Sequence, residues 1–431
     1  MARVLVSGAG VGGLALAVAL RERGLCVTVF EREASIQGAS ARSTGLALWP
    51  NGVNAARRLA PALRLDERIL AGGSVLKATT FFSDGSGSGP GMRSAHDYVE
   101  EYGAPAVTLR WRALNEALAS ALPEDTVTFG SSLVSYEVTP DGVRATFADA
   151  SGQRSTHDAD ILVGADGIRS AVRAQLFGAD DPAPLRSSGR IAWRAVVADS
   201  PQMRVFVPAG ESMLVASPSA GDGGKTMTLM HVGQEFYWGL GALESGAAPL
   251  PSGPEVDAVA ARTETTFAGW PAAQAALAAT PRGAILQQRL YDRAPLPADA
   301  LSKAGPVTLL GDAMHAMIPS LGQGACSALE GALELAQCLA ACEVEMEADG
   351  ILHGIARPRA ATLRAALRRY EVARLQRVAA IQTRSASAGA AAYKKTDAAA
   401  KGSTISQLSQ EDFTRWLFDY VSPHPEVAGR A

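Results

Sequence analysis

The chain has 431 residues, 47% of them apolar, and its 40 basic and 43 acidic side chains leave a formal charge of −3. This balance excludes the basic field of a nucleic-acid binder. No apolar run reaches the ~18 residues of a membrane span, although association with a membrane surface stays open. Four scattered cysteines favour a reducing compartment over a disulfide scaffold. With no leader expected before the first strand, we expect a cytoplasmic protein of two or three domains.

The first elements in chain order predict one β-α-β unit. Residues 3–7 form a short apolar strand, residues 14–23 have the Ala- and Leu-rich pattern of a helix, and residues 26–30 are apolar and β-branched. The sequence Gly-Ala-Gly-Val-Gly-Gly, residues 8–13, lies between the first strand and the helix. A strand, a glycine-rich turn and a helix are the setting of a dinucleotide-binding fingerprint.

The later elements change from parallel to antiparallel character and back. Short β-rich runs between residues 187 and 240 are separated by Gly, Pro, Ser and Asp, and they predict a separate antiparallel sheet. Residues 75–82 look like one more strand of that sheet. A buried strand at 307–310 then precedes Gly311-Asp312, and residues 356–392 are Ala- and Arg-rich and strongly helical. For the basic face of that helix we expect solvent or acidic neighbours.

Three glycines and one acidic residue carry the dinucleotide prediction. Gly8 permits the sharp turn, Gly10 lets the backbone approach a pyrophosphate, and Gly13 lets the helix pack close to the strand. Free N–H groups at the helix N-terminus favour phosphates. Glu31 lies 23 residues after Gly8, at the end of the second strand, where a carboxylate can accept both ribose hydroxyls. The pattern predicts an adenine dinucleotide and leaves NAD and FAD open.

Two later motifs favour FAD, by resemblance. The sequence Gly-Ala-Asp-Gly-Ile-Arg-Ser begins at residue 164, and the sequence Gly-Asp-Ala-Met-His at residue 311 is followed by Pro319 and by Gly322-Gln323-Gly324. In this order and spacing, the motifs resemble those of the single-component FAD-dependent aromatic hydroxylases, the group A flavoprotein monooxygenases. The runs 48–52 and 191–194 are most similar to the short members typified by 3-hydroxybenzoate 6-hydroxylase, zeaxanthin epoxidase and flavin-dependent urate hydroxylase.

The resemblance implies a mixed α/β fold. It consists of a Rossmann-like, glutathione-reductase-like FAD-binding domain, an inserted antiparallel β-sheet substrate domain, and C-terminal helices. The FAD-binding domain is expected to comprise residues 1–73, 106–183 and 283–350, the substrate domain residues 74–105 and 184–282, and the C-terminal helical segment residues 351–431.

The resemblance also assigns FAD contacts residue by residue. Asp312 is expected to bind a hydroxyl of the ribityl chain, and Asp166 to serve both the flavin and the use of the nicotinamide cofactor. The helix that begins near Gly322 would direct free N–H groups at the flavin N1 and C2 carbonyl, where negative charge appears on reduction. The expected cofactor-binding residues are Gly8, Gly10, Gly13, Glu31, Arg32, Arg42, Arg112, Val134, Asp166, Asp312, Pro319, Gly322, Gly324, Ala325 and Cys326.

Two positions depart from the usual family pattern. Gly331 stands where the family usually has Asp, and a glycine inside a helix costs ~1 kcal/mol of helix stability, which leaves the packing of this helix open. Cys326 stands where many members have Asn; the flavin needs its backbone N–H, and we expect the thiol to pack rather than react. Cys338 and Cys342, four residues apart, are expected in the core and not at a metal.

Three residues are candidates for the substrate side of the site. His231 lies on a predicted strand that could face the substrate and act as a general base for a phenol; a hydrogen-bonded sheet histidine is the alternative. Arg194 resembles a family residue near the active site, and either Tyr237 or its neighbour Trp238 is expected to line the pocket. No Gly-x-Ser-x-Gly, His-Glu-x-x-His or paired-cysteine spacing supports a hydrolase or a metal site.

The function implied by the resemblance is monooxygenation with non-covalently bound FAD. NAD(P)H is a transient co-substrate, and O₂ forms a C4a-hydroperoxyflavin that transfers oxygen to a small aromatic or heteroaromatic substrate. The alternative is epoxidation of an isoprenoid or other alkene. Two other classes are a simple NAD-dependent dehydrogenase, against which the later motifs argue, and a binding protein without turnover. The substrate, NADH against NADPH, and monomer against homodimer stay open.

Overall fold

A five-stranded parallel sheet carries the glycine-rich turn of residues 8–13. The computed structural model describes residues 1–39, 44–83, 87, 89–217, 224–244, 256–353, 359–391 and 408–424. The strands lie in the order β18-β12-β1-β2-β8, and all neighbouring pairs are parallel. They are β1 (Arg3–Ser7), β2 (Cys26–Phe30), β8 (Val127–Thr128), β12 (Ile161–Gly164) and β18 (Val307–Leu309).

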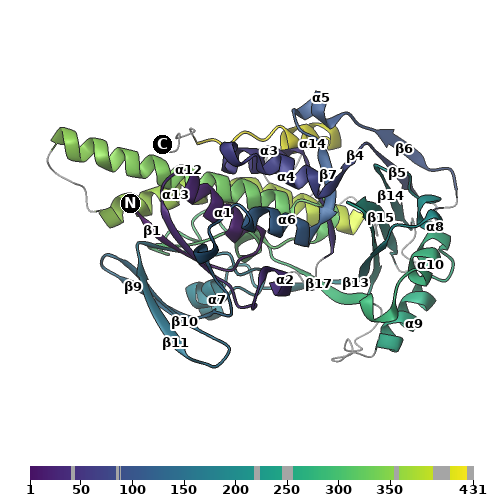
Figure 1. Ribbon diagram of the computed structural model, residues 1–431, viewed down its shortest axis with the longest axis horizontal. Helices are drawn as coiled ribbons and strands as arrows, with labels where there is room; N and C mark the ends of the chain where they lie inside the picture. Colours follow the sequence, from purple (N-terminus) through teal and green to yellow (C-terminus); the bar gives the residue numbers. More distant parts are fainter. Residues whose placement is uncertain are drawn as a thin grey trace.

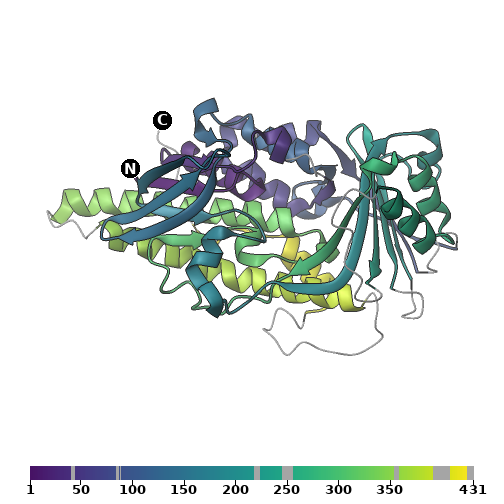
Figure 2. The ribbon, with the colours of Figure 1, turned by 90° about the horizontal axis from the view of Figure 1, so that it is seen from below.

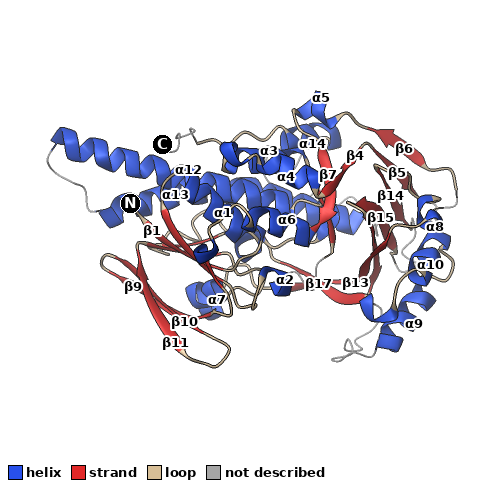
Figure 3. Ribbon diagram, viewed as in Figure 1, coloured by secondary structure: helices blue, strands red, loops and turns tan. Residues whose placement is uncertain are grey.

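Helices cover one face of this sheet, and a smaller sheet covers the other (Figures 1 and 3). α1 (Val11–Glu22) follows β1 and is buried over most of its length, because its Ala and Leu side chains pack against the sheet and α12 (Gly324–His353). On the opposite face, Phe147 stacks on Phe30 of β2 with 3.8 Å between ring centroids. Phe147 belongs to the antiparallel sheet of β9 (Ser132–Thr139), β10 (Gly142–Ala148) and β11 (Arg154–Ala159).

A seven-stranded sheet forms the other end of the molecule (Figure 2). Its order is β17-β13-β16-β15-β14-β5-β6, and all neighbouring pairs are antiparallel except β14 and β5. The strands are β5 (Ala78–Phe82), β6 (Met92–Ala95), β13 (Arg186–Ala198), β14 (Glu211–Ala216), β15 (Thr226–Val232), β16 (Glu235–Leu243) and β17 (Leu286–Asp292). The sheet therefore takes β17 from the stretch that the sequence assigns to the FAD-binding part.

The two faces of the seven-stranded sheet have different neighbours. Side chains alternate between the faces of a strand, and Trp193 of β13 and Trp238 of β16 are buried on the outer face against Phe267 and Trp270. This face is covered by α8 (Pro201–Arg204), α9 (Val256–Thr266) and α10 (Pro271–Ala278), which lie on the side away from the parallel sheet (Figure 2). The inner face is turned towards the parallel sheet.

A three-stranded sheet, β3-β7-β4, lies between the two larger sheets (Figure 1). It contains β3 (Gly45–Leu48), β7 (Ala106–Arg110) and β4 (Gly73–Leu76). The predicted strand at residues 75–82 is therefore divided: its beginning belongs to β4 and the rest to β5 of the large sheet. The remaining helices are α2 (Ile36–Ala39), α3 (Pro50–Leu59), α4 (Leu65–Ala71), α5 (Tyr98–Tyr102), α6 (Trp111–Ala119), α7 (Ala171–Phe177) and α11 (Asp312–His315).

Three C-terminal helices complete the structure: α12, α13 (Arg359–Ala391) and α14 (Gln410–Phe418). Two arginines of the basic helix α13 meet acidic neighbours, since Arg374 and Arg377 both pair with Glu330 of α12. The expectation about membrane spans needs one amendment. Among the residues described, α12 from Gly324 to Met346 is long and apolar enough to cross a membrane, but 89% of its most apolar window is buried, as in a core helix of a soluble protein.

Candidate active site

The glycine turn between β1 and α1 has the geometry that the fingerprint requires. Gly8 has φ +105°, and a Cβ there would lie 2.5 Å from the carbonyl oxygen of Ala165. A Cβ on Gly13 would lie 1.9 Å from the carbonyl oxygen of Gly8, whereas a Cβ on Gly10 would meet no protein atom within 4 Å. Gly8 and Gly13 are therefore required by the packing of the protein itself. Gly10, at the N-terminus of α1, faces open space that suits a phosphate.

Glu31 is held beside this turn at the end of β2. Its side chain is buried, and its two carboxylate oxygens accept hydrogen bonds from the N–H of Ala9 (2.7 Å) and of Glu33 (3.0 Å). Each carboxylate oxygen can accept more than one hydrogen bond. The carboxylate is thus oriented by the backbone and retains the capacity to bind a ribose hydroxyl.

Two further carboxylates follow the carboxyl ends of neighbouring strands of the parallel sheet. Asp166, after β12, accepts from the N–H of Ala171 (2.7 Å) and Val172 (3.2 Å), while its Oδ1 is buried without a hydrogen-bond partner among the described residues. Burial raises the pKa of Asp166. Asp312, after β18, is accessible to solvent, yet desolvation by the surrounding protein raises its pKa. An accessible carboxylate crowded by protein atoms suits a ligand-lining position.

The turn before α12 supplies a second open position. Gly322 has φ +62°, and a Cβ there would lie 2.7 Å from Nε1 of Trp49. At Gly324, the first residue of α12, a Cβ would meet no protein atom within 4 Å, and the adjacent Ala325 is half-buried. This helix N-terminus is therefore open to a close approach by a planar ring.

Cys326 has a packing role in the structure. Its side chain is fully buried, its Sγ accepts from the backbone N–H of Trp49 at 3.4 Å, and burial raises the pKa of the thiol to about 12. A thiol with so high a pKa is a poor nucleophile. Cys338 and Cys342 are buried too, and the described part of the chain contains no cluster of three or more His, Cys, Asp or Glu side chains that could hold a metal ion.

The two open turns lie close together. A Cβ on Gly12, near the start of α1, would lie 3.3 Å from Leu310 and 3.6 Å from Ala328 of α12. Two helix N-termini and the carboxylate of Asp312 therefore occur on the same side of the parallel sheet, at the carboxyl ends of its strands. Open α/β sheets bind their ligands at this position.

Arg194 and Tyr237 lie together on the inner face of the seven-stranded sheet. Arg194 of β13 pairs with Gly239 in the sheet register and its guanidinium donates to Gln288 of β17, while its Nε is buried without a partner in the described ranges. Burial raises the pKa of Tyr237, and the positive charge of Arg194 lowers it by a smaller amount. The position of a Cβ on Gly45 of β3 would be only 2.6 Å from the Tyr237 ring.

β3 connects this inner face to the turn before α12. Gly45 contacts Tyr237, and Trp49, just after the strand, contacts Gly322. At ~3.3 Å per residue, these four steps of chain span about 13 Å. β3 therefore sets the distance between the inner face of the sheet and the start of α12.

His231 does not lie at this site, which corrects the expectation that its strand position turns it towards the substrate. It shares the outer face of β15 with Met227 and Leu229, and its Nε2 lies 3.1 Å from the carbonyl oxygen of Val207. Its Nδ1 is 3.9 Å from Asp199. It is the hydrogen-bonded sheet histidine of the alternative interpretation.

The other expected FAD contacts lie on or near the surface. Arg32 pairs with Glu33 at 3.7 Å and Arg112 with Glu116 at 2.8 Å, and the two arginine side chains are 73% and 45% exposed. Val134 is exposed at an irregularity of the β9–β10 pairing, Pro319 is exposed before α12, and Arg42 lies outside the described residues. Their roles stay predictions.

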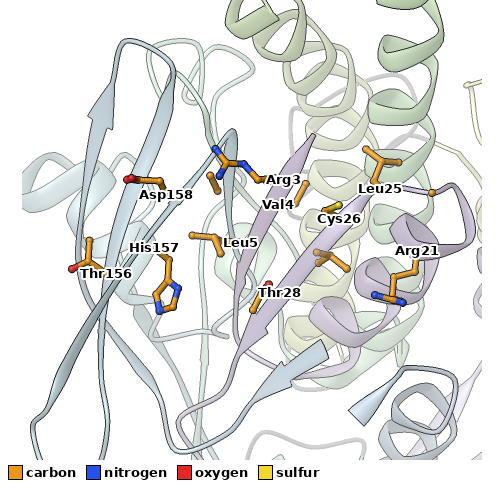
Figure 4. A pocket seen from close by; sticks show the side chains of 13 residues that line it. Arg3, Val4, Leu5, Arg21, Leu25, Cys26, Thr28, Thr156, His157 and Asp158 are labelled. Atoms are coloured by element: carbon orange, nitrogen blue, oxygen red, sulfur yellow. The ribbon is translucent and has the colours of Figure 1, made fainter. Parts of the chain in front are cut away.

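A separate cavity of about 700 Å³ lies at the opposite ends of β1 and β2 (Figure 4). Its lining includes Arg3, Cys26 and Asp158. These residues belong to the beginning of β1, the beginning of β2 and β11, whereas the glycine turn follows the end of β1. Asp158 is paired with Arg144 at 2.7 Å. The cavity is therefore not part of the candidate active site.

Sequence reasoning missed a buried polar cluster behind the turn before α12. Asn51 of α3 donates through Nδ2 to Gln323 (3.0 Å) and to Glu330 (2.7 Å), and Glu330 also binds Arg374 and Arg377. These side chains are buried. The run 48–52 contributed only to the family likeness in the sequence, and no local pattern indicates which polar residues meet across such distances in the chain.

Comparisons with known proteins agree with this geometry. Residues 1–370 match the protein family described as FAD binding domain. The chain is 32% identical to the aurachin C monooxygenase/isomerase of Stigmatella aurantiaca, over 87% of this chain and 85% of that protein. It is 33% identical to the chloroplastic zeaxanthin epoxidase of Solanum lycopersicum over 99% of this chain, which spans only 59% of the epoxidase.

A solved structure extends the comparison to the fold. Klebsiella pneumoniae HpxO, in complex with FAD and uric acid, matches with a TM-score of 0.71 and 25% identity, over 97% of this chain and 92% of that one. The glycine turn, the two strand-end carboxylates and the open start of α12 are thus accompanied by likeness along almost the whole chain. The chain belongs to the FAD-binding group A flavoprotein monooxygenases.

Proposed function

We propose that this monooxygenase uses NAD(P)H and O₂ to hydroxylate a small aromatic or heteroaromatic compound. The observation that carries the proposal is the pair of open helix N-termini, at Gly10 and Gly324, with Asp312 near them and the inner face of the large sheet opposite. The uric acid bound by HpxO supports a heteroaromatic substrate. FAD, when bound, supplies the electron-transfer and oxygen-activating chemistry.

The residues of this chain would bind and orient FAD and the substrate, and would keep water away from them. Gly10 and the N-terminus of α1 would hold the pyrophosphate, Glu31 the ribose, and the N-terminus of α12 the ring edge where negative charge develops. Arg194, with its unpartnered buried Nε, would hold an acceptor group of the substrate. The large sheet would exclude water from the reacting atoms. No residue of this set needs to act as a nucleophile.

The test measures NAD(P)H oxidation and products with a panel of phenols, N-heterocycles and polyenes. A hydroxylated product, formed in proportion to the NAD(P)H consumed, is expected with an aromatic member of the panel. Arg194→Gln should raise KM for that substrate at least tenfold, while Arg186→Gln should not, because Arg186 of the same strand pairs with Asp292 instead. Hydrogen peroxide as the sole product throughout the panel would refute monooxygenation by this chain.

Epoxidation of an alkene is the second candidate. It is favoured by the 33% identity to zeaxanthin epoxidase over 99% of this chain. The same panel separates the two functions, because an epoxide from a polyene with no hydroxylated aromatic product would replace the first proposal with the second.

A further inference from the structure

The C-terminal segment of residues 408–424 is connected through Trp49 to the turn that begins α12, although the two are far apart in the chain. Phe418 of α14 stacks on Trp49 with 5.4 Å between ring centroids and an interplanar angle of 17°. Trp49 in turn packs against Gly322. This is one physical route from the C-terminal segment to the turn.

A second route consists of hydrogen bonds. Arg377 of α13 donates through Nη2 to the carbonyl oxygen of Leu417 (2.8 Å) and to Glu330 (2.8 Å), and through Nε to the other oxygen of Glu330 (2.9 Å). Glu330 accepts from Asn51, and Asn51 donates to the side chain of Gln323. Gln323 lies between Gly322 and Gly324, so the chain of contacts ends in the turn itself.

The side chains of this second route are held in place by ring contacts and by burial. Arg377 lies over the rings of Trp416 (4.5 Å) and Tyr420 (4.2 Å), both of the C-terminal segment. Asn51, Gln323 and Glu330 are at most 1% exposed. A buried carboxylate with two guanidinium partners is a directional, specific contact, and removing one member disturbs the others.

Arg374 of α13 also contacts Glu330, and it lies beside Gly331 of α12. Arg374 binds Glu330 through Nη2 at 2.7 Å, but its Nε and Nη1 have no hydrogen-bond partner among the described residues. A Cβ at Gly331 would lie 3.6 Å from that Nε, so the glycine leaves this side of Arg374 without a side-chain acceptor. Glu334 instead lies 3.6 Å from Arg374 Nη1 and accepts the hydroxyl hydrogen of Tyr420.

We propose that the C-terminal segment 408–424 belongs to the flavin site, where Arg377, Glu330 and Asn51 act as positioning residues that hold Gln323 and thereby the turn from Gly322 to Gly324. The proposal rests on the flavin position proposed above. A correctly held turn directs its N–H groups at the ring edge that becomes negative on reduction, and a displaced turn does not. The segment therefore contributes to FAD affinity and to the reduction potential without touching the cofactor.

The test uses two variants that leave the net charge unchanged, so that a shift in potential reports geometry. Asn51→Ala removes the link between Glu330 and Gln323 but leaves Glu330 paired with both arginines, and Arg377→Lys keeps the cation but loses the bidentate contact. We expect each holoenzyme to release FAD at least fivefold faster. We also expect the ratio of the affinities for reduced and oxidised FAD to fall tenfold. For a two-electron couple, this corresponds to a reduction potential of the bound flavin that is ~30 mV lower.

The controls separate positioning from folding. Arg415→Gln, in the same C-terminal segment, removes an exposed pair with Glu411 and should leave both quantities at the wild-type values. Thermal unfolding verifies that each variant folds. If only one of the two linking variants, Asn51→Ala and Arg377→Lys, folds, that variant alone is sufficient to test the proposal. Because the residues form one chain of contacts, the double variant Asn51→Ala/Arg377→Lys should shift the potential no further than the larger single effect.

Three results would overturn the proposal. The first is wild-type potential and FAD release in a folded Asn51→Ala or Arg377→Lys protein. The second is additive shifts in the double variant, which would show separate effects. The third is an equal shift in Arg415→Gln. A Gly324→Val variant shows whether the proposed flavin position is itself wrong. If Gly324→Val shifts the potential and the linking variants do not, the flavin position stands and only the positioning role of Asn51 and Arg377 is refuted.

Discussion

At the scale of single residues, the two glycines of the first turn differ in what surrounds them. A Cβ at Gly13 would overlap the carbonyl oxygen of Gly8, whereas a Cβ at Gly10 would meet no protein atom. Gly10 has φ −75°, which any residue can adopt. The two glycines of one motif are therefore required for different reasons, one by the protein and one by the ligand.

This difference makes a prediction about apoprotein stability. Gly10→Ala should change the free energy of unfolding by no more than about 0.5 kcal/mol but weaken FAD binding at least tenfold, since the methyl group would occupy the pyrophosphate position. Gly13→Ala should destabilise the apoprotein itself by more than the ~1–3 kcal/mol that overpacking usually costs. The new methyl group would overlap the carbonyl oxygen of Gly8, and a backbone atom cannot move aside as a side chain can. Urea unfolding of both apoproteins and FAD titration decide; a Gly10→Ala protein with wild-type FAD affinity would remove this turn from the binding site.

At the scale of elements, α12 carries both a core role and a site role. Most of the helix is buried, whereas its first residue, Gly324, faces open space. A helix N-terminus carries roughly half a positive charge. An aromatic ring that becomes anionic on reduction would be stabilised there, provided that it can approach closely.

The prediction for this element is the effect of Gly324→Val. The protein should fold, because a Cβ at this position meets no protein atom within 4 Å. The side chain should hold the ring away from the helix N-terminus, so FAD should bind more weakly and its potential should fall by tens of millivolts, as expected for losing ~1–3 kcal/mol of stabilisation of the anion. Spectroelectrochemistry measures the potential, and a wild-type value would separate this turn from the flavin.

Local elements could be predicted from the sequence, and long-range contacts could not. The β-α-β unit, the strand before Gly311 and the basic helix each have a local pattern, and the structure contains all three. The local sequence pattern does not predict on which face of β15 His231 lies, because a shift of one residue in register exchanges the two faces of a strand. The contacts of Glu330 with Asn51 and Arg377 were missed for a related reason: each is a single pairing between distant segments.

At the scale of the whole molecule, several charged side chains of α12 and α13 are buried where the two helices pack together, among them Glu330, Glu371 and Arg374. Burial opposes ionisation of Glu330, but the charges of Arg377 and Arg374 outweigh it and lower its pKa to about 2. Glu371 of α13 accepts from the hydroxyl of Thr308 of β18 at 2.9 Å, and burial raises its pKa to about 7. Burial, with the nearby charge of Arg374, lowers the pKa of His315 to about 3.

These three groups predict how stability depends on pH. Between pH ~4.3 and 7 the folded protein binds a proton at Glu371 that the unfolded chain lacks, so this group's contribution to stability falls as pH rises. Over about pH 3 to 6.5 the unfolded chain binds a proton at His315 that the folded protein lacks, so its contribution rises with pH. The two contributions oppose each other, and we expect the free energy of unfolding to vary little between pH 5 and 7. Below about pH 4.5, Glu330 is protonated in the unfolded chain first, and stability should fall steeply.

Glu371→Gln tests this balance, because it removes only the component that falls with pH. The free energy of unfolding of the variant should rise between pH 5 and 7, relative to the wild type, by on the order of 2–3 kcal/mol, which corresponds to the shift of the Glu371 pKa from ~4.3 in the unfolded chain. Urea unfolding at pH 4, 5, 6 and 7 measures the difference, with Glu411→Gln as a control, since that side chain is 84% exposed. Parallel curves for the wild type and Glu371→Gln would show that Glu371 titrates at its ordinary pKa. In that case, the contact between α13 and β18 would bury an ionised Glu371, which accepts the hydrogen bond of Thr308 and pairs with Arg368 of α13 itself.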